Sequence, residues 1–247
     1  MTTVFVHGVP ETAETWDKVR AEFADVDSVA LSLPGFGVPV PDGFGATMDE
    51  YADWLIGALE AIGEPVDLVG HDWGGLLVGR LISVRPDLLR SWVSDAIGGF
   101  DPEWEWHAFA KIWQTPGEGE DFFAAIRSLS VEDQAATFTA LGVPDDDAVA
   151  MVNAGSPAMD DCILKLYRSA VDIEKRWGPD LGKVPAPGLV LMPSDDPFAE
   201  AGRSQRVAER AGARIERLDG AGHFWPYQAP AAGAAALRRF WSSLPHA

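Results

Sequence analysis

Three polar positions in the chain could together carry out nucleophilic catalysis: Asp72, the pair Asp195-Asp196, and His223. Each follows a short apolar run with strand character, in the chain order nucleophile, acid, base. A carboxylate nucleophile attacks a carbon centre and leaves an ester on the protein, and a histidine can then activate the water that hydrolyses this ester. An acidic side chain would orient the imidazole and stabilise its charge. The residues alone leave open which of the two adjacent aspartates does so.

Asp72 lies at a sharp turn between an apolar strand and a helix expected from about Gly74 to Val84. Its surroundings, Gly70-His71-Asp72-Trp73-Gly74-Gly75, match the small-x-nucleophile-x-small-small pattern of a strained turn that exposes its central residue. The glycines suit this turn because a side chain there would meet the neighbouring strand or helix. Serine is the usual central residue. Aspartate disfavours acyl transfer, since the product would be a reactive anhydride, and favours displacement at a saturated carbon, as in an epoxide or an alkyl halide.

The rest of the chain shows alternating strand and helix signals. Strands are expected at 4–6, 29–33, 66–69, 92–97, 187–192 and 214–218, and helices near 16–23, at 48–62, from 74 and from 230. Apolar residues at 48, 52, 55, 59 and 62 show helical spacing, and Gly63 closes that helix. Alternating strands and helices imply an α/β fold with a parallel sheet covered on both faces.

This alternation is interrupted after Gly99. Residues 101–181 show mainly helical segments and no convincing strand. We therefore predict an α/β core formed by residues 1–100 and 182–247, with residues 101–181 inserted as a helical cap. An insertion at this point would lie over the carboxyl edge of the sheet, where open α/β folds bind ligands.

Composition limits the classes of partner and compartment. A length of 247 residues accommodates one α/β domain with an insertion. The formal net charge of −19 disfavours nucleic acid and anionic membranes as partners. The single Cys162 excludes an internal disulfide, and neither a membrane span nor a secretion signal is evident, so we expect a soluble cytoplasmic protein. The acidic run 145–147 lacks histidine or cysteine at ligand spacing, and we expect neither metal nor cofactor.

Five segments together resemble the α/β-hydrolase superfamily, and within it the branch of epoxide hydrolases and haloalkane dehalogenases. They are His7-Gly8-Val9-Pro10, Leu33-Pro34-Gly35-Phe36-Gly37, Gly70-His71-Asp72-Trp73-Gly74-Gly75, Asp196-Pro197-Phe198 and Gly222-His223-Phe224. The resemblance covers nearly the whole chain and implies an α/β-hydrolase fold. In that family the acid directly precedes a Pro-Phe pair, which implies Asp196 as the partner of His223. It also implies an oxyanion hole made by the backbone N–H groups of Val9 and Trp73.

One feature departs from the family pattern. Members usually carry two more strands before the His-Gly strand, whereas three residues precede Val4. We therefore expect a mainly parallel sheet of about six strands, with the strand at 29–33 at an edge. An exposed edge is a pairing site, so this edge would allow a homodimer.

Cap residues distinguish the two reactions of this branch. An epoxide oxygen needs a proton donor as the ring opens, whereas a departing halide needs N–H donors and no proton. Epoxide hydrolases use two cap residues, commonly tyrosines, to bind the epoxide oxygen, and one of them donates the proton. Leu166-Tyr167-Arg168 resembles the segment of the second tyrosine, and Trp106-His107 resembles a bacterial subset in which histidine replaces the first. The resemblance thus implies Tyr167 and His107 as the pair in an epoxide hydrolase that adds water to a small apolar substrate.

Two alternatives stay open. A haloalkane dehalogenase would use the same triad and hold the halide with the indole N–H of Trp73 and of a cap tryptophan. A haloacetate dehalogenase is disfavoured because positions 73 and 76 are Trp and Leu rather than arginine. The second alternative is a non-catalytic ligand-binding protein with this fold. The many aromatic residues predict an apolar pocket, with four candidate substrate contacts: Trp73, Trp106, Trp113 and Phe224.

Overall fold

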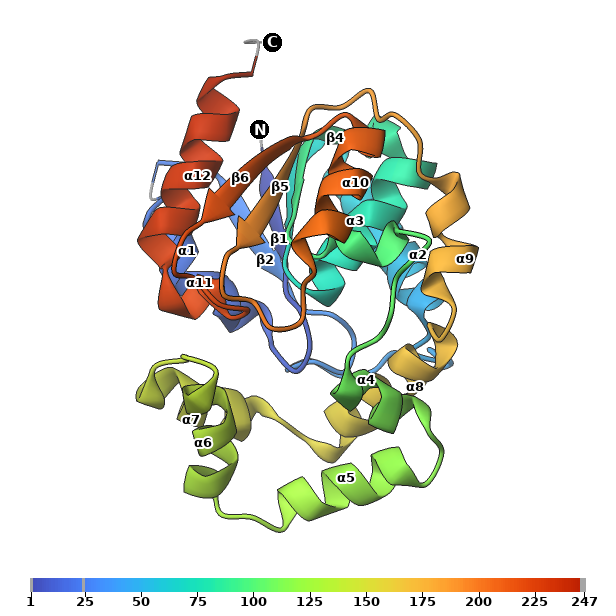
Figure 1. Cartoon of the computed structure of the whole chain (residues 1–247), viewed down its shortest axis with the longest axis vertical. Coiled ribbons are helices and arrows are strands. Elements are labelled where there is room, and N and C mark those ends of the chain that lie inside the picture. The colour runs from blue at the N-terminus through green and yellow to red at the C-terminus, as the bar shows by residue number, and fades with distance from the viewer. Residues whose placement is uncertain (1, 24, 245–247) are drawn as a thin grey trace.

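The strands form one parallel six-stranded sheet in the computed structural model, which describes residues 2–23 and 25–244. The order across the sheet is β2-β1-β3-β4-β5-β6, and every neighbouring pair is parallel (Figure 1). The strands are β1 (Thr3–Val6), β2 (Ser28–Leu31), β3 (Val66–Gly70), β4 (Leu89–Ser94), β5 (Gly188–Pro193) and β6 (Arg214–Leu218). The predicted parallel sheet of about six strands is confirmed, with β2 at one edge.

Helices cover both faces of this sheet (Figure 1). The helices on one face are α2 (Met48–Ile62), α3 (Trp73–Val84) and α10 (Ala201–Ala211), and those on the other are η1 (Ala13–Trp16), α1 (Asp17–Ala21), α11 (Trp225–Gln228) and α12 (Pro230–Ser242). Successive side chains of a strand point to opposite faces. In β1, Val4 and Val6 therefore pack in the core under α2 and α3, while Phe5 packs with Trp16 and Leu237 on the opposite face.

Local signals set the ends of α2, whose predicted range is confirmed. The Thr47 hydroxyl accepts a hydrogen bond from the Glu50 backbone N–H at 3.3 Å, and the Glu50 carboxylate accepts one from the Thr47 N–H at 3.1 Å. This reciprocal pair satisfies two backbone donors that the helix itself cannot. At the other end Gly63 has a φ of 81°, a left-handed conformation that suits glycine.

The strand predicted at 92–97 is wrong at both ends. β4 begins at Leu89 and ends at Ser94, and the apolar residues after it form a 3-10 turn, η3 (Ile97–Phe100). A second 3-10 turn, η2 (Pro86–Leu88), precedes β4. A short buried apolar run has the same composition in a strand and in a helical turn, so periodicity could not separate them. The difference matters because it places Asp95 directly after the strand.

The predicted helical insertion between β4 and β5 is confirmed, and it has two parts (Figure 1). The helices α4 (Ala108–Gln114), α5 (Glu118–Arg127) and α8 (Pro157–Ser169) pack on one another, and α6 (Val131–Ala140) and α7 (Asp145–Ala154) form a hairpin beside them. The chain returns to the sheet through α9 (Ile173–Arg176) and η4 (Gly178–Asp180), which pack on η3. The bounds 101–181 remain a prediction.

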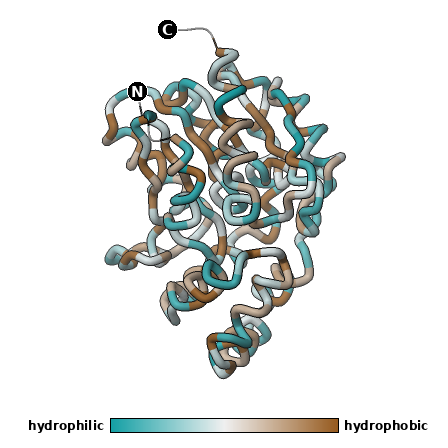
Figure 2. The backbone as a smooth tube through the Cα atoms, turned by 90° about the vertical axis from the view of Figure 1, so that its left-hand side faces the viewer, coloured by the Kyte–Doolittle hydropathy of each residue, from teal (hydrophilic) through white to brown (hydrophobic). Residues whose placement is uncertain are grey.

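Hydrophobic segments run through the interior of the sheet layer, and polar segments lie on its outer turns (Figure 2). Within residues 2–23 and 25–244, no helix has the length and apolar character needed to cross a bilayer. The cap, which lies below the sheet in Figure 1, faces the ends at which the parallel strands finish. The loops that leave these strand ends therefore open toward the cap.

Candidate active site

The positions predicted to carry the chemistry meet at the carboxyl edge of the sheet. The register aligns Val6 of β1 with Gly70 of β3, and Gly70 with Ser94 of β4, so the loops after these strands begin at one level. Asp72 follows β3, Asp196 follows β5 and His223 follows β6. Parallel pairing therefore converts three positions far apart in the sequence into neighbours.

The backbone at Asp72 adopts the strained turn that the sequence predicted. Asp72 has φ 50° and ψ −118°, and it directly precedes the first residue of α3. A positive φ is unfavourable for a residue with a side chain, and such strain is typical of functional turns. The turn also needs close backbone approach, because a Cβ on Gly74 would overlap the Val6 carbonyl oxygen and one on Gly8 would overlap the Asp72 side chain. The glycine spacing is thus explained by packing.

The two carboxylate oxygens of Asp72 have different surroundings. Oδ1 accepts a hydrogen bond from the Val9 backbone N–H at 2.8 Å, and the Trp73 backbone N–H also stabilises the carboxylate. Oδ2 lies 3.7 Å from Nε2 of His223. Burial raises the pKa of Asp72, although His223, His71 and the two N–H groups oppose that rise. One oxygen is therefore held by backbone N–H groups, and the other lies toward His223.

His223 contacts Asp196, the aspartate that the resemblance implied. Its Nδ1 donates to Oδ2 of Asp196 at 2.9 Å, and the other oxygen of Asp196 accepts from the Phe198 backbone N–H at 2.8 Å. Burial opposes a charge on His223, but the adjacent carboxylate of Asp196 outweighs it, so the pKa of His223 is raised. Asp195 instead accepts from the Ser194 hydroxyl at 2.8 Å and is exposed. The geometry leaves Nε2 of His223 free toward Asp72.

A second histidine, His71, lies beneath the turn in a network that sequence reasoning missed. Its Nδ1 donates to Oδ2 of Asp95 at 2.6 Å, and its Nε2 lies 3.5 Å from Oε1 of Glu11. Asp95 also accepts from the backbone N–H of Asp72 at 2.9 Å and from the Trp225 indole at 2.6 Å. All three members of this network, Glu11, His71 and Asp95, are buried. Asp95 thus ties the strained turn to the elements beneath it.

This network places a positive charge under Asp72. Burial disfavours the imidazolium of His71, but Asp95 and Glu11 outweigh burial and raise its pKa well above the ordinary value. The charge of His71 in turn lowers the pKa of Asp72. The sequence signal was a lone aspartate in an apolar run, and it was missed because the predicted strand at 92–97 included Asp95, which the structure places directly after β4.

A cavity of about 1060 Å³, counted with its open mouth, extends from Asp72 between the core and the cap. Most of its lining is aromatic or aliphatic, with side chains from α4, α5, α6, α7 and α8. Of the predicted substrate contacts, Trp113 and Phe224 line it. Phe198, which sequence reasoning did not select, lies between His107 and His223, with ring centroids 5.0 and 4.9 Å away. An apolar pocket is therefore present above the carboxylate.

Two predicted substrate contacts lie outside this lining. The Trp106 indole donates to the Ala170 carbonyl at 2.9 Å, and its ring stacks on Trp73 at 5.8 Å between centroids. Trp73 is fully buried and meets the Tyr167 ring edge-on at 5.4 Å. Trp106 as a direct substrate contact stays a prediction; in the structure its N–H is bonded to the backbone and its ring packs against Trp73 and Tyr167. The Trp73 side chain likewise supports Tyr167 from behind.

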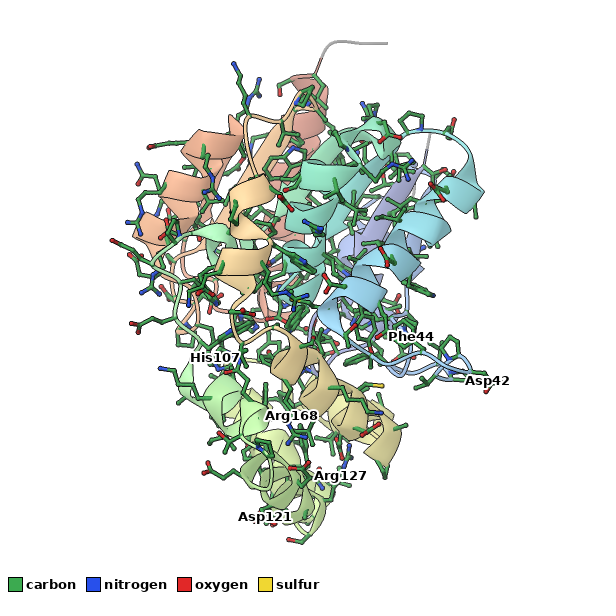
Figure 3. The ribbon with its side chains drawn as sticks, turned by 90° about the vertical axis from the view of Figure 1, so that its right-hand side faces the viewer. Asp42, Phe44, His107, Asp121, Arg127 and Arg168 are labelled. Carbon is green, nitrogen blue, oxygen red and sulfur yellow. The ribbon has the colours of Figure 1, made fainter. Side chains whose placement is uncertain are left out.

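The two predicted cap donors, His107 and Tyr167, both line the cavity. Their ring centroids are 6.3 Å apart (His107 is labelled in Figure 3). Burial, and then the charge of Asp72, raises the pKa of Tyr167 well above its ordinary value, so the hydroxyl keeps its proton. Burial, and then the charge of His223, lowers the pKa of His107 to about 4. Nδ1 of His107 accepts the Ala110 backbone N–H at 3.2 Å, so the neutral ring carries its proton on Nε2.

Sequence comparison places these features among known proteins. The chain is 29% identical over 141 residues to epoxide hydrolase 3 of Siraitia grosvenorii, a segment that is 50% of this chain and 44% of that protein. The chain spans between 30% and 55% of the length of the curated relatives it matches. Their activities are therefore properties of longer proteins.

Solved structures match over almost the whole chain. An epoxide hydrolase solved without ligand superposes with a TM-score of 0.82 over 99% of this chain and 92% of that one, at 19% identity. A haloalkane dehalogenase of Bradyrhizobium elkani superposes with a TM-score of 0.75 over 98% of this chain and 90% of that one, also at 19% identity. At such identities the likeness establishes the fold.

The family itself follows from the sequence match together with this fold. The model of the alpha/beta hydrolase family matches residues 3–236, which includes the turn at Asp72, the cap and the loop of His223. The parallel sheet and its helical insertion agree with that assignment. The chain therefore belongs to the alpha/beta hydrolase family.

Proposed function

We propose that the protein is an epoxide hydrolase that converts an apolar epoxide to a diol through an ester on Asp72. The observation that carries this proposal is that two neutral cap side chains line the same cavity as the carboxylate, and each has a proton to donate: the Tyr167 hydroxyl and Nε2–H of His107. A halide leaves without a proton, whereas an opening epoxide needs one. The network beneath the turn supports the proposal by fixing the carboxylate in place.

In the first step, Oδ2 of Asp72 forms a bond to one ring carbon, and the bond between that carbon and the epoxide oxygen breaks. The electron pair goes to the epoxide oxygen, which takes the proton of the Tyr167 hydroxyl while Nε2–H of His107 donates a hydrogen bond. The Tyr167 phenolate is transient, since its pKa is far above the ordinary value, and it regains a proton from water. The product is an alkyl ester whose carbonyl oxygen, Oδ1, stays on the Val9 N–H.

In the second step, Nε2 of His223 takes a proton from water, and the resulting hydroxide attacks Cγ of Asp72. Charge then develops on Oδ1, where the Val9 and Trp73 N–H groups stabilise it. Collapse of this intermediate breaks the Cγ–Oδ2 bond, and the alkoxide leaves with the proton from His223. The carboxylic acid left at Asp72 gives its proton to the hydroxide that formed when water reprotonated Tyr167, so the carboxylate is restored. Asp196 stabilises the imidazolium throughout, at 2.9 Å from Nδ1.

A haloalkane dehalogenase is the second candidate, and one observation favours it. The indole N–H of Trp113 is buried and has no hydrogen-bond partner among the described residues, and the indole N–H of Trp73 is buried beside the Tyr167 hydroxyl. Two such donors could hold a departing halide. Only Trp113 lines the cavity, however, which leaves the epoxide reaction better supported.

The mechanism is tested by incubating His223→Gln with styrene oxide and recording the intact mass. Ester formation survives in this variant while hydrolysis stops, so a covalent adduct should accumulate on Asp72. Wild-type protein should form the diol from styrene oxide and release little bromide from dibromoethane. Bromide release without diol would select the dehalogenase. Absence of any adduct with panels of epoxides and halides would remove both and leave the non-catalytic binding protein, which predicts tight retention of a small ligand.

A further inference from the structure

An ion pair interrupts the apolar lining of the cavity. Arg127, at the end of α5, donates from Nε to Oδ2 of Asp160 at 2.8 Å and from Nη2 to Oδ1 at 2.7 Å. Asp160 lies in the first turn of α8. Both side chains line the cavity that reaches Asp72. The cavity therefore has a charged, hydrogen-bonding element in addition to the groups at its floor.

The position of Asp160 relative to Tyr167 follows from the geometry of helix α8. Asp160, Ile163 and Tyr167 are spaced by three and four residues, so they lie on one face of α8, and all three line the cavity. Seven residues with a rise of about 1.5 Å each separate Asp160 from Tyr167 by about 10 Å. Asp160 thus lies about two helical turns along α8 from Tyr167, with the apolar Ile163 between them.

The pairing leaves part of the guanidinium unused. Asp160 takes the edge formed by Nε and Nη2, so Nη1 and the second N–H of Nη2 have no acceptor among the described residues. The guanidinium lies close to Gly155, where a Cβ would be 3.0 Å from Nη2 and 3.1 Å from Nη1. Gly155 also lines the cavity. The N–H groups of Nη1 and Nη2 on this edge form a fork that can donate hydrogen bonds to a carbonyl oxygen or a similar acceptor.

A second ion pair joins the same two helices outside the cavity. Arg168 of α8 donates from Nη1 and Nη2 to Glu120 of α5 at 2.8 and 2.7 Å. Neither residue lines the cavity. The two arginine side chains are similarly exposed, at 27% for Arg168 and 31% for Arg127, whereas the Glu120 side chain is 53% exposed against 13% for Asp160. Charges taken out of water pay a desolvation penalty, so an exposed pair joins two helices at less cost. The cavity pair therefore calls for a further role.

We propose that Arg127 binds the far end of the substrate, which is an apolar chain with an uncharged hydrogen-bond acceptor, such as an ester or amide carbonyl, about 10 Å from the reacting carbon. Asp160 already neutralises Arg127, so a carboxylate there would place two anions on one guanidinium. The net charge of −19 disfavours a further anion. This inference rests on the proposed function for the identity of the reacting group, and it concerns the opposite end of the molecule.

Binding of unreactive analogues tests the proposal separately from the chemistry. About eight carbon–carbon bonds of about 1.5 Å span the distance in a zigzag chain. The probes are the methyl ester of a terminal undecenoic acid and the hydrocarbon dodecene, neither of which has a ring to open. Quenching of tryptophan fluorescence reports their Kd values, since Trp113 lines the cavity. The quantity of interest is the preference for the ester over the hydrocarbon.

The test variant combines Arg127→Met with Asp160→Asn, so that no unpaired carboxylate is left. Its matched control combines Arg168→Met with Glu120→Gln, which removes the other tie between α5 and α8. The ester preference should fall about tenfold in the test variant, the effect of one hydrogen bond to a charged group, and should be unchanged in the control. If the test variant does not fold, Arg127→Lys keeps a charge for Asp160, lacks the fork, and should lose the preference as well.

An equal ester preference in wild type, test variant and control would overturn the proposal. Tighter binding of the undecenoate anion than of its methyl ester would overturn the assignment of an uncharged end group. Neither result depends on epoxide opening. Failure of the adduct experiment would instead count against the proposed function, and the binding preference would still be measured.

Discussion

The strand-end loops and the cap hold their polar groups in different ways. In the loops, each charged group has fixed partners: Asp72 on the Val9 N–H, Asp196 on the Phe198 N–H, and Asp95 on three donors. In the cap, Tyr167 lies among rings, with Trp113 and Trp106 at 4.8 and 5.2 Å between centroids. Backbone partners on a sheet cannot shift independently, whereas packed rings can be exchanged for others of similar volume. We infer that the loops determine the reaction and the cap determines the substrate.

The largest expected effect tests the loop side of this comparison. Asp72→Asn retains the shape of the side chain, and asparagine tolerates the φ of 50°. Diol formation should fall about ten-thousandfold, as when one member of a catalytic set is removed. The melting temperature should stay close to that of the wild type. Near-normal turnover in a folded variant would mean that another group is the nucleophile.

The next effect tests the cap. Tyr167→Phe removes the hydroxyl and leaves the ring contacts, so ester formation should slow about a hundredfold. Hydrolysis of the ester should be unchanged, because it depends on His223. Stopped-flow tryptophan fluorescence separates the two steps.

His107→Asn serves as the companion variant of Tyr167→Phe. Asparagine still caps α4, because its side-chain oxygen can accept the Ala110 backbone N–H as Nδ1 of His107 does, while the donor into the cavity is lost. Its effect should be smaller than that of Tyr167→Phe. An equal loss of halide displacement and of epoxide opening in Tyr167→Phe would contradict the assigned proton donor.

The Asp95→Asn variant tests whether the buried network supports the turn. Asp95→Asn leaves the His71 imidazolium with one carboxylate partner, so stability should fall by about 3 kcal/mol. Because Asp95 also holds the Asp72 backbone N–H at 2.9 Å, kcat should fall about tenfold, the scale of a single hydrogen bond. Urea unfolding and steady-state kinetics measure the two effects.

Asp67→Asn is the matched control for the network. Asp67 is buried in β3 and pairs with Arg90 and Ser91, away from the cavity. It should cost comparable stability and leave kcat unchanged. If both variants lowered kcat equally, Asp95 would have no positioning role beyond general stability.

The smallest effect is a separation of the two steps by pH. Ester hydrolysis needs neutral His223, whose pKa is raised because Asp196 outweighs burial, so this step slows as pH falls through that value. Ester formation needs ionised Asp72, whose pKa is raised by burial from a lower starting value of 3.8. Mild acidification should therefore let the ester accumulate. Rapid-quench mass spectrometry across pH reports it, and loss of ester formation before hydrolysis would reverse the assignment.

Much of the fold was predictable because its signals are local. The motif of the turn at Asp72 lies within six residues and is recognisable from them alone, although Gly74 and Gly75 meet Val6 and Ser94 of the neighbouring strands. The helix from Met48 to Ile62 carries its own capping box and its closing glycine. The strand ranges followed from apolar runs, except where such a run after Ser94 became a 3-10 turn. Segments of this kind specify their structure through their own backbone and nearest side chains.

The roles of the histidines needed the tertiary structure. Both ring nitrogens of His7 form hydrogen bonds with the backbone, Nδ1 with the Gly8 carbonyl and Nε2 with the Leu33 N–H. His71 instead lies between two carboxylates. His107 is held neutral, and the pKa of His223 is raised by Asp196. The sequence shows these four histidines as equivalent side chains, because the ring alone does not determine its charge.

The sequence by itself determined the sharp turn at Asp72, the parallel sheet and the inserted helices. Only the tertiary structure decided that Asp95 supports the turn, that Trp106 packs behind Tyr167, and that Arg127 faces the cavity. The physical reason is the sequence separation of the contacts involved. Backbone turns depend on contacts within a few residues, whereas burial, charge and hydrogen-bond partners are supplied by elements that are distant in the chain and adjacent only after folding.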